Sequence, residues 1–110
     1  MKKKYTIKSK KLGFINVSFS NHASRRMLER DIDLLDILLS LTISSNDICI
    51  AKENRVVLLL NEEKKISILL SISHLNNDIH YFNLVTLLNY IPRNQDGILK
   101  FHNIATYITT

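Results

Sequence analysis

The stretch RVVLLLNEEKKISILLSIS, residues 55–73, contains two apolar runs on either side of the polar tetrapeptide EEKK. Each run has the length of a strand and is rich in Val, Ile and Leu, and the tetrapeptide is typical of a turn. Continuous apolar runs are expected where a strand is buried on at least one face. The stretch therefore predicts two neighbouring strands covered by other parts of the chain.

Further strands are predicted on the C-terminal side of this stretch. YFNLVTLLNYI, residues 81–91, has the same apolar character, and HLNNDIH before it predicts a turn or loop. Of Tyr81 and Phe82, one is expected in the core and the other is available to stack a base. PRNQDG, residues 92–97, predicts a loop before a C-terminal element. The pattern of residues 98–110 fits a strand or a short helix equally well.

Helices are predicted on the N-terminal side. Residues 5–19 alternate loosely and are interrupted by Gly13, which indicates a hairpin or a bent strand. Ser20 or Asn21 is a suitable N-cap for a helix that ends near residue 30. Asp33 starts a second helix, and its apolar sequence LLDILLSLTI ends near residue 43.

The order of these elements predicts an α+β fold. An N-terminal strand or hairpin precedes two short helices, and an antiparallel meander of about four strands follows, with the helices packed on one face. The segment DICIA, residues 47–51, is assigned to a strand because its apolar residues alternate. A length of 110 residues corresponds to one domain, residues 1–110, in which residues 1–4 are expected to be flexible.

Several classes of site are excluded by composition. The single cysteine, Cys49, rules out an intramolecular disulfide framework and lies in an apolar segment, which favours a core position. Two glycines, with no GxxxxGK or GxGxxG, leave no nucleotide-cradling loop. His74, Asp78 and His80 have a spacing more typical of a polar turn than of a metal site. We therefore expect no metal, no cofactor and, without a long apolar run, no membrane anchoring.

Charge is concentrated at the N-terminal end. Residues 1–30 carry nine lysines and arginines against Glu29, so their net charge is +8 while the whole chain has +5. The other eighty residues therefore sum to −3. A basic end attracts a phosphate backbone or an acidic protein. The candidate nucleic-acid contacts here are Lys8, Lys10, Lys11 and Arg25.

The helix NHASRRMLER, residues 21–30, places His22, Arg26 and Arg30 four residues apart. Such positions advance by about 40° around a helix, so the three side chains form one stripe. An imidazole beside guanidiniums suits abstraction of a proton from a ribose hydroxyl, with the arginines stabilising charge on the phosphorus. The alternative is an ordinary solvated helix whose arginines pair with nearby acids such as Glu29.

The segment FSNHASRRMLERDID, residues 19–33, resembles the opening helix of small bacterial toxins of the RelE/ParE/BrnT type, which reads approximately H-A-x-x-R-M-x-x-R-x-I. The resemblance extends over roughly residues 19–90 and includes LVTLL at the position of a late strand. The positions that match the helix motif are His22, Ala23, Arg26, Met27, Arg30 and Ile32. These toxins belong to a fold group with barnase-like, EndoU-like and colicin-type ribonucleases, including toxins of contact-dependent growth inhibition.

This resemblance implies metal-independent cleavage of tRNA or mRNA by attack of a 2′-hydroxyl, which leaves a 2′,3′-cyclic phosphate. His22 would be the general base or acid, Arg26 and Arg30 the phosphate ligands, and Thr86 a hydroxyl contact. The chain departs from the family in a longer C-terminal tail, where His102 and Tyr107 are further candidates. The resemblance also implies an acidic antitoxin or immunity protein as partner and action in the cytoplasm, as a free toxin or as part of a secreted effector.

Two other functions remain open at this point. A catalytically inert member of the same fold would bind RNA or protein through the basic helix. An immunity or antitoxin protein is the third possibility, and the net positive charge argues against it, because proteins that mask ribonuclease clefts are usually acidic.

Overall fold

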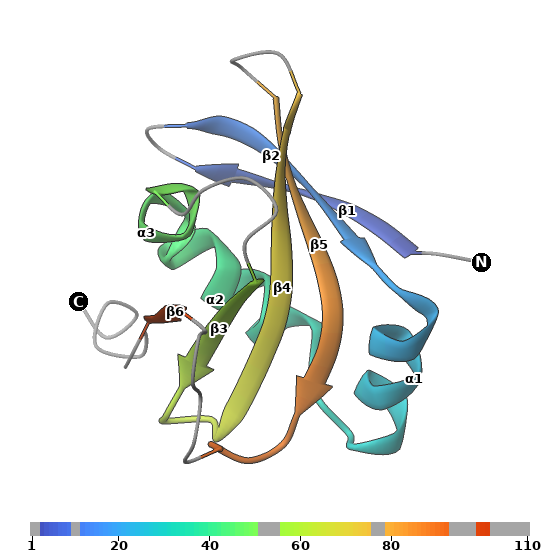
Figure 1. Cartoon of the computed structure of the whole chain (residues 1–110). Coiled ribbons are helices and arrows are strands. Elements are labelled where there is room, and N and C mark those ends of the chain that lie inside the picture. The colour runs from blue at the N-terminus through green and yellow to red at the C-terminus, as the bar shows by residue number, and fades with distance from the viewer. Residues whose placement is uncertain (1–2, 10–11, 51–55, 76–78, 93–98, 102–110) are drawn as a thin grey trace.

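The fold is built on one mixed sheet. A computed structural model describes residues 3–9, 12–50, 56–75, 79–92 and 99–101. The elements are β1 (Lys3–Ser9), β2 (Gly13–Phe19), α1 (Asn21–Glu29), α2 (Leu34–Ile43), α3 (Ser45–Ile50), β3 (Val56–Asn61), β4 (Ile66–Leu75), β5 (Ile79–Leu88) and β6 (Leu99–Phe101). The six described strands follow the order β1-β2-β5-β4-β3-β6 across the sheet (Figure 1).

The predicted α+β class is confirmed, with its N-terminal hairpin and its meander. β1 and β2 are antiparallel, as are β3, β4 and β5 in succession. The meander has three strands instead of about four, because the segment DICIA, assigned to its first strand, is helical. Strand β6 pairs parallel to β3. The hairpin and the meander join through a parallel pairing of β2 with β5, which the sequence pattern did not predict.

The two apolar runs around EEKK form the hairpin β3–β4. Asn61, at the end of β3, is only 1% exposed, and its amide has partners on both sides. Its Nδ2 donates to the Ser40 hydroxyl of α2 at 3.0 Å, and its Oδ1 accepts from the Lys64 backbone in the turn at 3.1 Å. Lys65 completes the predicted EEKK turn with a positive φ of 56°. One buried amide thus ties the turn to the helix layer.

The helices begin at the predicted caps. The Ser20 hydroxyl accepts from the Ala23 backbone at 3.0 Å, and the Asp33 carboxylate accepts from the Leu35 backbone at 3.0 Å. In Figure 1, α2 and α3 lie behind the sheet, and α1 lies beside the C-terminal end of β5. Ile37, Leu41 and Ile48 from α2 and α3 are fully buried, so α2 packs on one face of the sheet as predicted and α3, which the sequence did not predict, packs there with it.

The prediction of a strand over DICIA is wrong. Asp47, Ile48, Cys49 and Ile50 belong to α3, whose backbone joins α2 through a hydrogen bond from Ile48 N to Ser44 O of 2.9 Å. Only Ser44 separates the two helices. An alternation over five residues is too short to distinguish a strand from a helical turn. Burial of Ile48 against the core favours the helix.

Other boundaries differ from the prediction in detail. Lys3 and Lys4, expected in a flexible end, lie in β1 opposite β2. The predicted loop HLNNDIH is shorter, since β4 continues to Leu75 and β5 begins at Ile79. The predicted loop of residues 92–97 falls almost wholly outside the described residues. Among the residues that are described, no helix has the length and hydropathy to cross a membrane.

The thiol of Cys49 is expected to react slowly with alkylating reagents. Burial disfavours the thiolate and raises the pKa of Cys49 from the ordinary value of 9.0 to about 11. Only the thiolate is nucleophilic, so alkylation by iodoacetamide at pH 8 should be about 100-fold slower than in the urea-unfolded chain. Equal rates in the folded and unfolded chains would contradict the core position of Cys49.

Candidate functional site

Helix α1 continues along the edge of β5 where β2 ends. The last pair between these strands is Phe19 with Leu84, so the rest of β5 has no β2 partner. Immediately after β2, the Ser20 backbone donates to Leu84 O and its hydroxyl donates to Val85 O, each at 3.0 Å. Ser20 therefore caps α1 and also binds the strand edge, which fixes the start of the helix beside β5.

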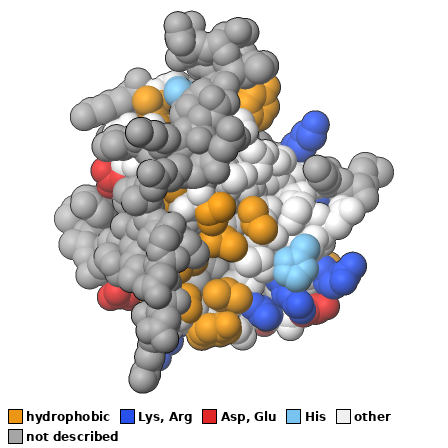
Figure 2. Space-filling model, in the orientation of Figure 1, with side chains coloured by type: hydrophobic (Ala, Val, Ile, Leu, Met, Phe, Trp, Pro, Cys, Tyr) orange, Lys and Arg blue, Asp and Glu red, His pale blue; other side chains and the backbone are white. Residues whose placement is uncertain are grey.

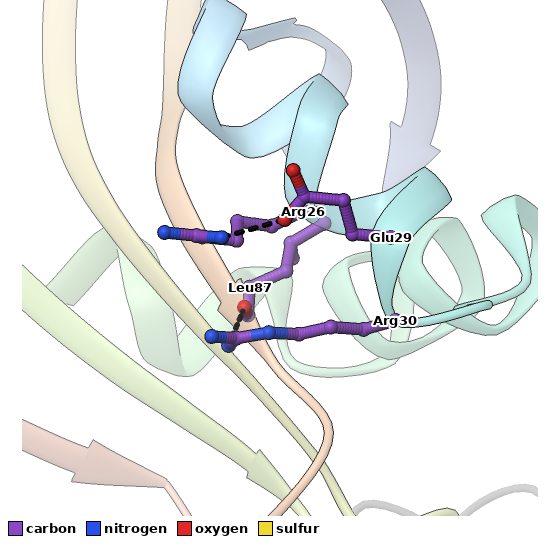
Figure 3. Close-up of polar contacts among 4 residues, drawn as sticks. All are labelled: Arg26, Glu29, Arg30 and Leu87. Carbon is purple, nitrogen blue, oxygen red and sulfur yellow. Dashed lines mark hydrogen bonds and ion pairs between the residues drawn. The ribbon is translucent and has the colours of Figure 1, made fainter.

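The far end of α1 is attached to the same strand. Arg30, the C-cap of α1, donates from Nη1 to the Leu87 carbonyl oxygen at 2.7 Å (Figure 3). A charged donor on a backbone carbonyl makes a short and strong hydrogen bond, and here it occupies an edge carbonyl that β2 does not reach. Residues 57 positions apart in sequence are thereby brought together.

A β-bulge in β5 determines the face of the sheet on which Thr86 lies. Leu70 pairs with Leu84 and Leu69 pairs with Thr86, so Val85 is an extra residue in β5. Without the bulge, strict alternation would place Thr86 on the same face as buried Leu84. With it, Leu87 is the buried residue and Thr86 is partly exposed on the face of the sheet opposite α2 and α3. Since none of the described helices packs on that face, we refer to it as the helix-free face. Thr86 is thus available to a ligand on that face, next to the carbonyl that Arg30 binds.

The predicted stripe on α1 is present, with its members in different surroundings. His22 and Arg25 are exposed, whereas Arg26 and Arg30 are partly buried. Arg26 forms an ion pair with Glu29 at 2.6 Å (Figure 3), which is the kind of pairing expected for an ordinary solvated helix. Figure 2 shows Lys and Arg side chains next to a histidine at the corner of the helix-free face where Figure 1 places α1.

The predicted lysine contacts are not at this corner. Lys8 is exposed in β1 with its Nζ 5.9 Å from the centre of the Phe14 ring, beside the first residues of β2. His22 follows the last residue of β2, so the two lie about 20 Å apart along the strand direction. Lys10 and Lys11, like the tail candidates His102 and Tyr107, fall outside the described residues. Of the predicted site residues, the structure links Arg30 to the residue that follows Thr86, and it places His22, Arg25 and Arg26 on α1, the helix of which Arg30 is the C-cap.

The described residues contain no group of three His, Cys, Asp or Glu side chains arranged as metal ligands. His74 and His80 are paired residues of β4 and β5, and Asp78 falls outside the described part.

Polar residues on the helix-free face were missed as site candidates. Asn16 and Ser18 of β2 and Asn83 of β5 line a groove there, together with Tyr81. The signal was present in the sequence as polar residues at every second position of FINVSF and YFNLV. An ordinary solvated sheet face shows the same alternation, so the pattern alone does not indicate a binding groove.

A comparison of the chain with protein-family models, with curated proteins and with solved structures finds no match. The resemblance to toxins of the RelE/ParE/BrnT type consequently rests on the motif residues of α1 and on the late strand. What the site can do chemically follows from its own residues. Its groups are an exposed imidazole and three guanidiniums on α1 or at its C-cap, and a hydroxyl on the neighbouring strand β5. Glu29 is the one acidic residue of α1.

Proposed function

We propose that the protein is a toxin-type endoribonuclease that cleaves tRNA or mRNA without a metal ion. The observation that carries this proposal is the hydrogen bond from Arg30 to the carbonyl of Leu87. It brings the basic helix to the residue next to Thr86, so two separate parts of the sequence motif meet at one corner of the sheet. The outward position of Thr86 at the bulge supports the same assignment.

In this proposal His22 accepts the proton of a ribose 2′-hydroxyl as its oxygen attacks the adjacent phosphorus. The bond from phosphorus to the 5′-oxygen breaks, the 5′-oxygen takes a proton from water, and a 2′,3′-cyclic phosphate remains on the other fragment, while His22 returns its proton to the solvent. The exposed position of His22 leaves its ring accessible to RNA. Proton transfer by a positioned side chain contributes typically 10²- to 10⁴-fold to a rate.

The arginines would stabilise the charge on the phosphorane-like transition state. Arg30 uses Nη1 on Leu87, and a guanidinium has five donors, so others are left for phosphate oxygens. Arg26 is paired with Glu29, whose side chain is 46% exposed. Such surface pairs contribute only about 0–1 kcal/mol, so a doubly bonded phosphate can replace Glu29. Arg25, exposed on the same helix, would extend the basic surface along the RNA backbone.

A second function is favoured by one observation. Both partly buried arginines already have protein partners, Glu29 and Leu87, as they would in a structural helix. A non-catalytic module of this fold would use His22 and Arg25 to bind RNA or protein without cleaving it. The partner proposed for the enzyme, an acidic antitoxin or immunity protein acting in the cytoplasm, would cover the same basic corner.

The purified protein should cleave single-stranded RNA in EDTA and leave DNA of the same sequence intact. The reason is that the nucleophile is the ribose 2′-hydroxyl and the other groups are side chains. The measurement is a gel of both labelled strands after incubation with the protein, with and without the chelator. Loss of cleavage in EDTA, or equal cleavage of DNA, would contradict the proposal.

A further inference from the structure

Two rows of polar side chains cross the helix-free face of the sheet. The first row is Thr6, Asn16, Tyr81 and Ser73, and the second is Lys4, Ser18, Asn83 and Ser71, each residue pairing with the next across β1, β2, β5 and β4. Six of these side chains line a groove of about 560 Å³, within the range of about 300–1,000 Å³ usual for ligand sites. In Figure 2, an area of white atoms, which are backbone and side chains neither charged nor apolar, lies beside the central orange apolar patch on this face.

The amide of Asn83 is held in a fixed orientation at the groove floor. Ser18, on the neighbouring β2, donates its hydroxyl to Asn83 Oδ1 at 2.8 Å. On the other side, Asn83 Nδ2 donates to the Ser73 hydroxyl at 3.3 Å. An amide has two donor hydrogens and two acceptor positions, so one of each is left after these bonds. A fixed donor and acceptor side by side match the edge of a nucleobase, as in the bidentate pairing of Asn with adenine.

An aromatic ring lies beside this amide. Phe82 is fully buried, and Tyr81 lies on the opposite face, partly exposed, where it lines the groove. This confirms the prediction that one of the pair is in the core and leaves the other available for stacking. Bases stack on aromatic side chains in sites for single-stranded nucleic acid, which are usually completed by polar groups.

The charge of the groove indicates a ligand that inserts a neutral group into it and carries its negative charge on a backbone outside. Lys4 is its single cation, and none of the residues that line it is acidic. A phosphate alone would be expected to select arginines or several lysines, as found on α1. The groove instead offers amides and hydroxyls to the ligand and one exposed lysine at its rim, beside exposed Lys3 of the same strand.

We infer that this groove binds a nucleobase of single-stranded RNA, with Tyr81 as the stacking surface and Asn83 as the group that reads the base edge. The inference rests on the proposed function and names how its substrate is selected. From Tyr81 to Thr86 the strand covers about 16 Å at ~3.3 Å per residue, so the base read in the groove lies more than one nucleotide from the bond cleaved beside α1. Between the groove and the corner at α1, the Ser20 hydroxyl donates a hydrogen bond to the Val85 carbonyl oxygen.

The test is binding of fluorescein-labelled 2′-O-methyl oligonucleotides, each a homopolymer of one base, which lack the attacking hydroxyl and are not cleaved. Tyr81→Ala should weaken binding roughly 5- to 150-fold, the loss expected for one stacked base. Tyr81→Phe, which keeps the ring, should bind within about twofold of the wild type. Asn83→Ala should reduce the difference in affinity between the four homopolymers, because the fixed amide distinguishes their edges.

The matched control is Tyr90→Ala, since Tyr90 is an exposed tyrosine beyond the end of β5 that does not line the groove. It should leave the affinity unchanged, and thermal melting of each variant checks that it is folded. Wild-type affinity of folded Tyr81→Ala, or no binding of any homopolymer by the wild type, would overturn the inference. Binding that depends on Tyr81 without cleavage of natural RNA would support it and overturn the proposed ribonuclease. RNA cleavage that is unaffected by Tyr81→Ala would overturn the inference about the groove and support the proposed ribonuclease.

Discussion

Replacing His22 with alanine is expected to reduce the rate of RNA cleavage by about 10²- to 10⁴-fold while leaving the folded structure intact. The loss is large because the imidazole is the proposed acceptor of the 2′-hydroxyl proton, and no other histidine lies on α1. The structural cost is small because His22 is exposed and the cap of α1 is made by Ser20. The measurement is kcat/KM on a short fluorescent RNA, with thermal melting of both proteins.

His22→Gln and Asn21→Ala are the matched controls. Glutamine keeps a polar side chain of similar reach and cannot transfer a proton, so its loss should equal that of alanine. Asn21 is the exposed neighbour of His22 in the same helical turn, and its replacement should leave the rate unchanged. If His22→Ala cleaves RNA like the wild type, histidine chemistry is wrong. If only the arginine variants change RNA affinity, the non-catalytic binding module is the better account.

Phe82→Ala should lower the free energy of unfolding by about 3–5 kcal/mol. Phe82 lies in β5, near the middle of the sheet, and is fully buried among side chains of the helix-covered face. A domain of this size is usually stable by only about 5–15 kcal/mol, so the variant should be close to unfolding at 37 °C. Urea unfolding followed by far-UV circular dichroism measures the difference.

Tyr81→Ala is the control for this prediction, because it removes a ring of nearly the same size from the residue that precedes Phe82. Its side chain is on the open face and partly exposed, so the expected cost is about 1 kcal/mol. Equal destabilisation by the two substitutions would contradict the assignment of these neighbours to opposite faces. It would also weaken the case for Tyr81 as a binding residue, since a buried ring is not available to a base.

Local signals in the sequence predict the helices α1 and α2 with their caps, and the hairpin β3–β4. Ser20 and Asp33 begin α1 and α2, because short polar side chains satisfy the free backbone donors of a first turn. The EEKK turn joins β3 and β4 for an equally local reason, the placement of four polar residues between two apolar runs. Each of these features is determined within a few residues, and for that reason each could be read from the sequence.

Features that depend on distant partners were not predicted. The parallel pairing of β2 with β5 joins residues about 65 positions apart, and the local sequence of neither strand indicates with which strand it pairs. The alternation in DICIA favours a strand, but five residues cannot distinguish an extended segment from a helical turn, and burial of Ile48 in the core accompanies the helix. The bulge at Val85 likewise depends on the register between β5 and β4. The face of the sheet on which Thr86 lies therefore cannot be predicted from the sequence of β5 alone.

The candidate site was predictable in part. The spacing of His22, Arg26 and Arg30 indicated one helical stripe, and the three residues do lie on α1 or at its C-cap. The sequence did not reveal that Arg30 would bind the Leu87 carbonyl, since that depends on where β2 stops pairing with β5. Lys8 was grouped with this site on charge alone, and the sheet separates them by the length of β2.

The most direct test of the ribonuclease is the chemistry of the fragment ends. Purified protein is incubated with a defined RNA in EDTA, and the products are analysed by mass spectrometry beside the same RNA with 2′-O-methyl groups. We expect 2′,3′-cyclic phosphate on one fragment, a 5′-hydroxyl on the other and no cleavage of the methylated strand. RNA left intact by the folded protein, or fragments with 5′-phosphate ends, would contradict attack by the 2′-hydroxyl and with it the function assigned to α1.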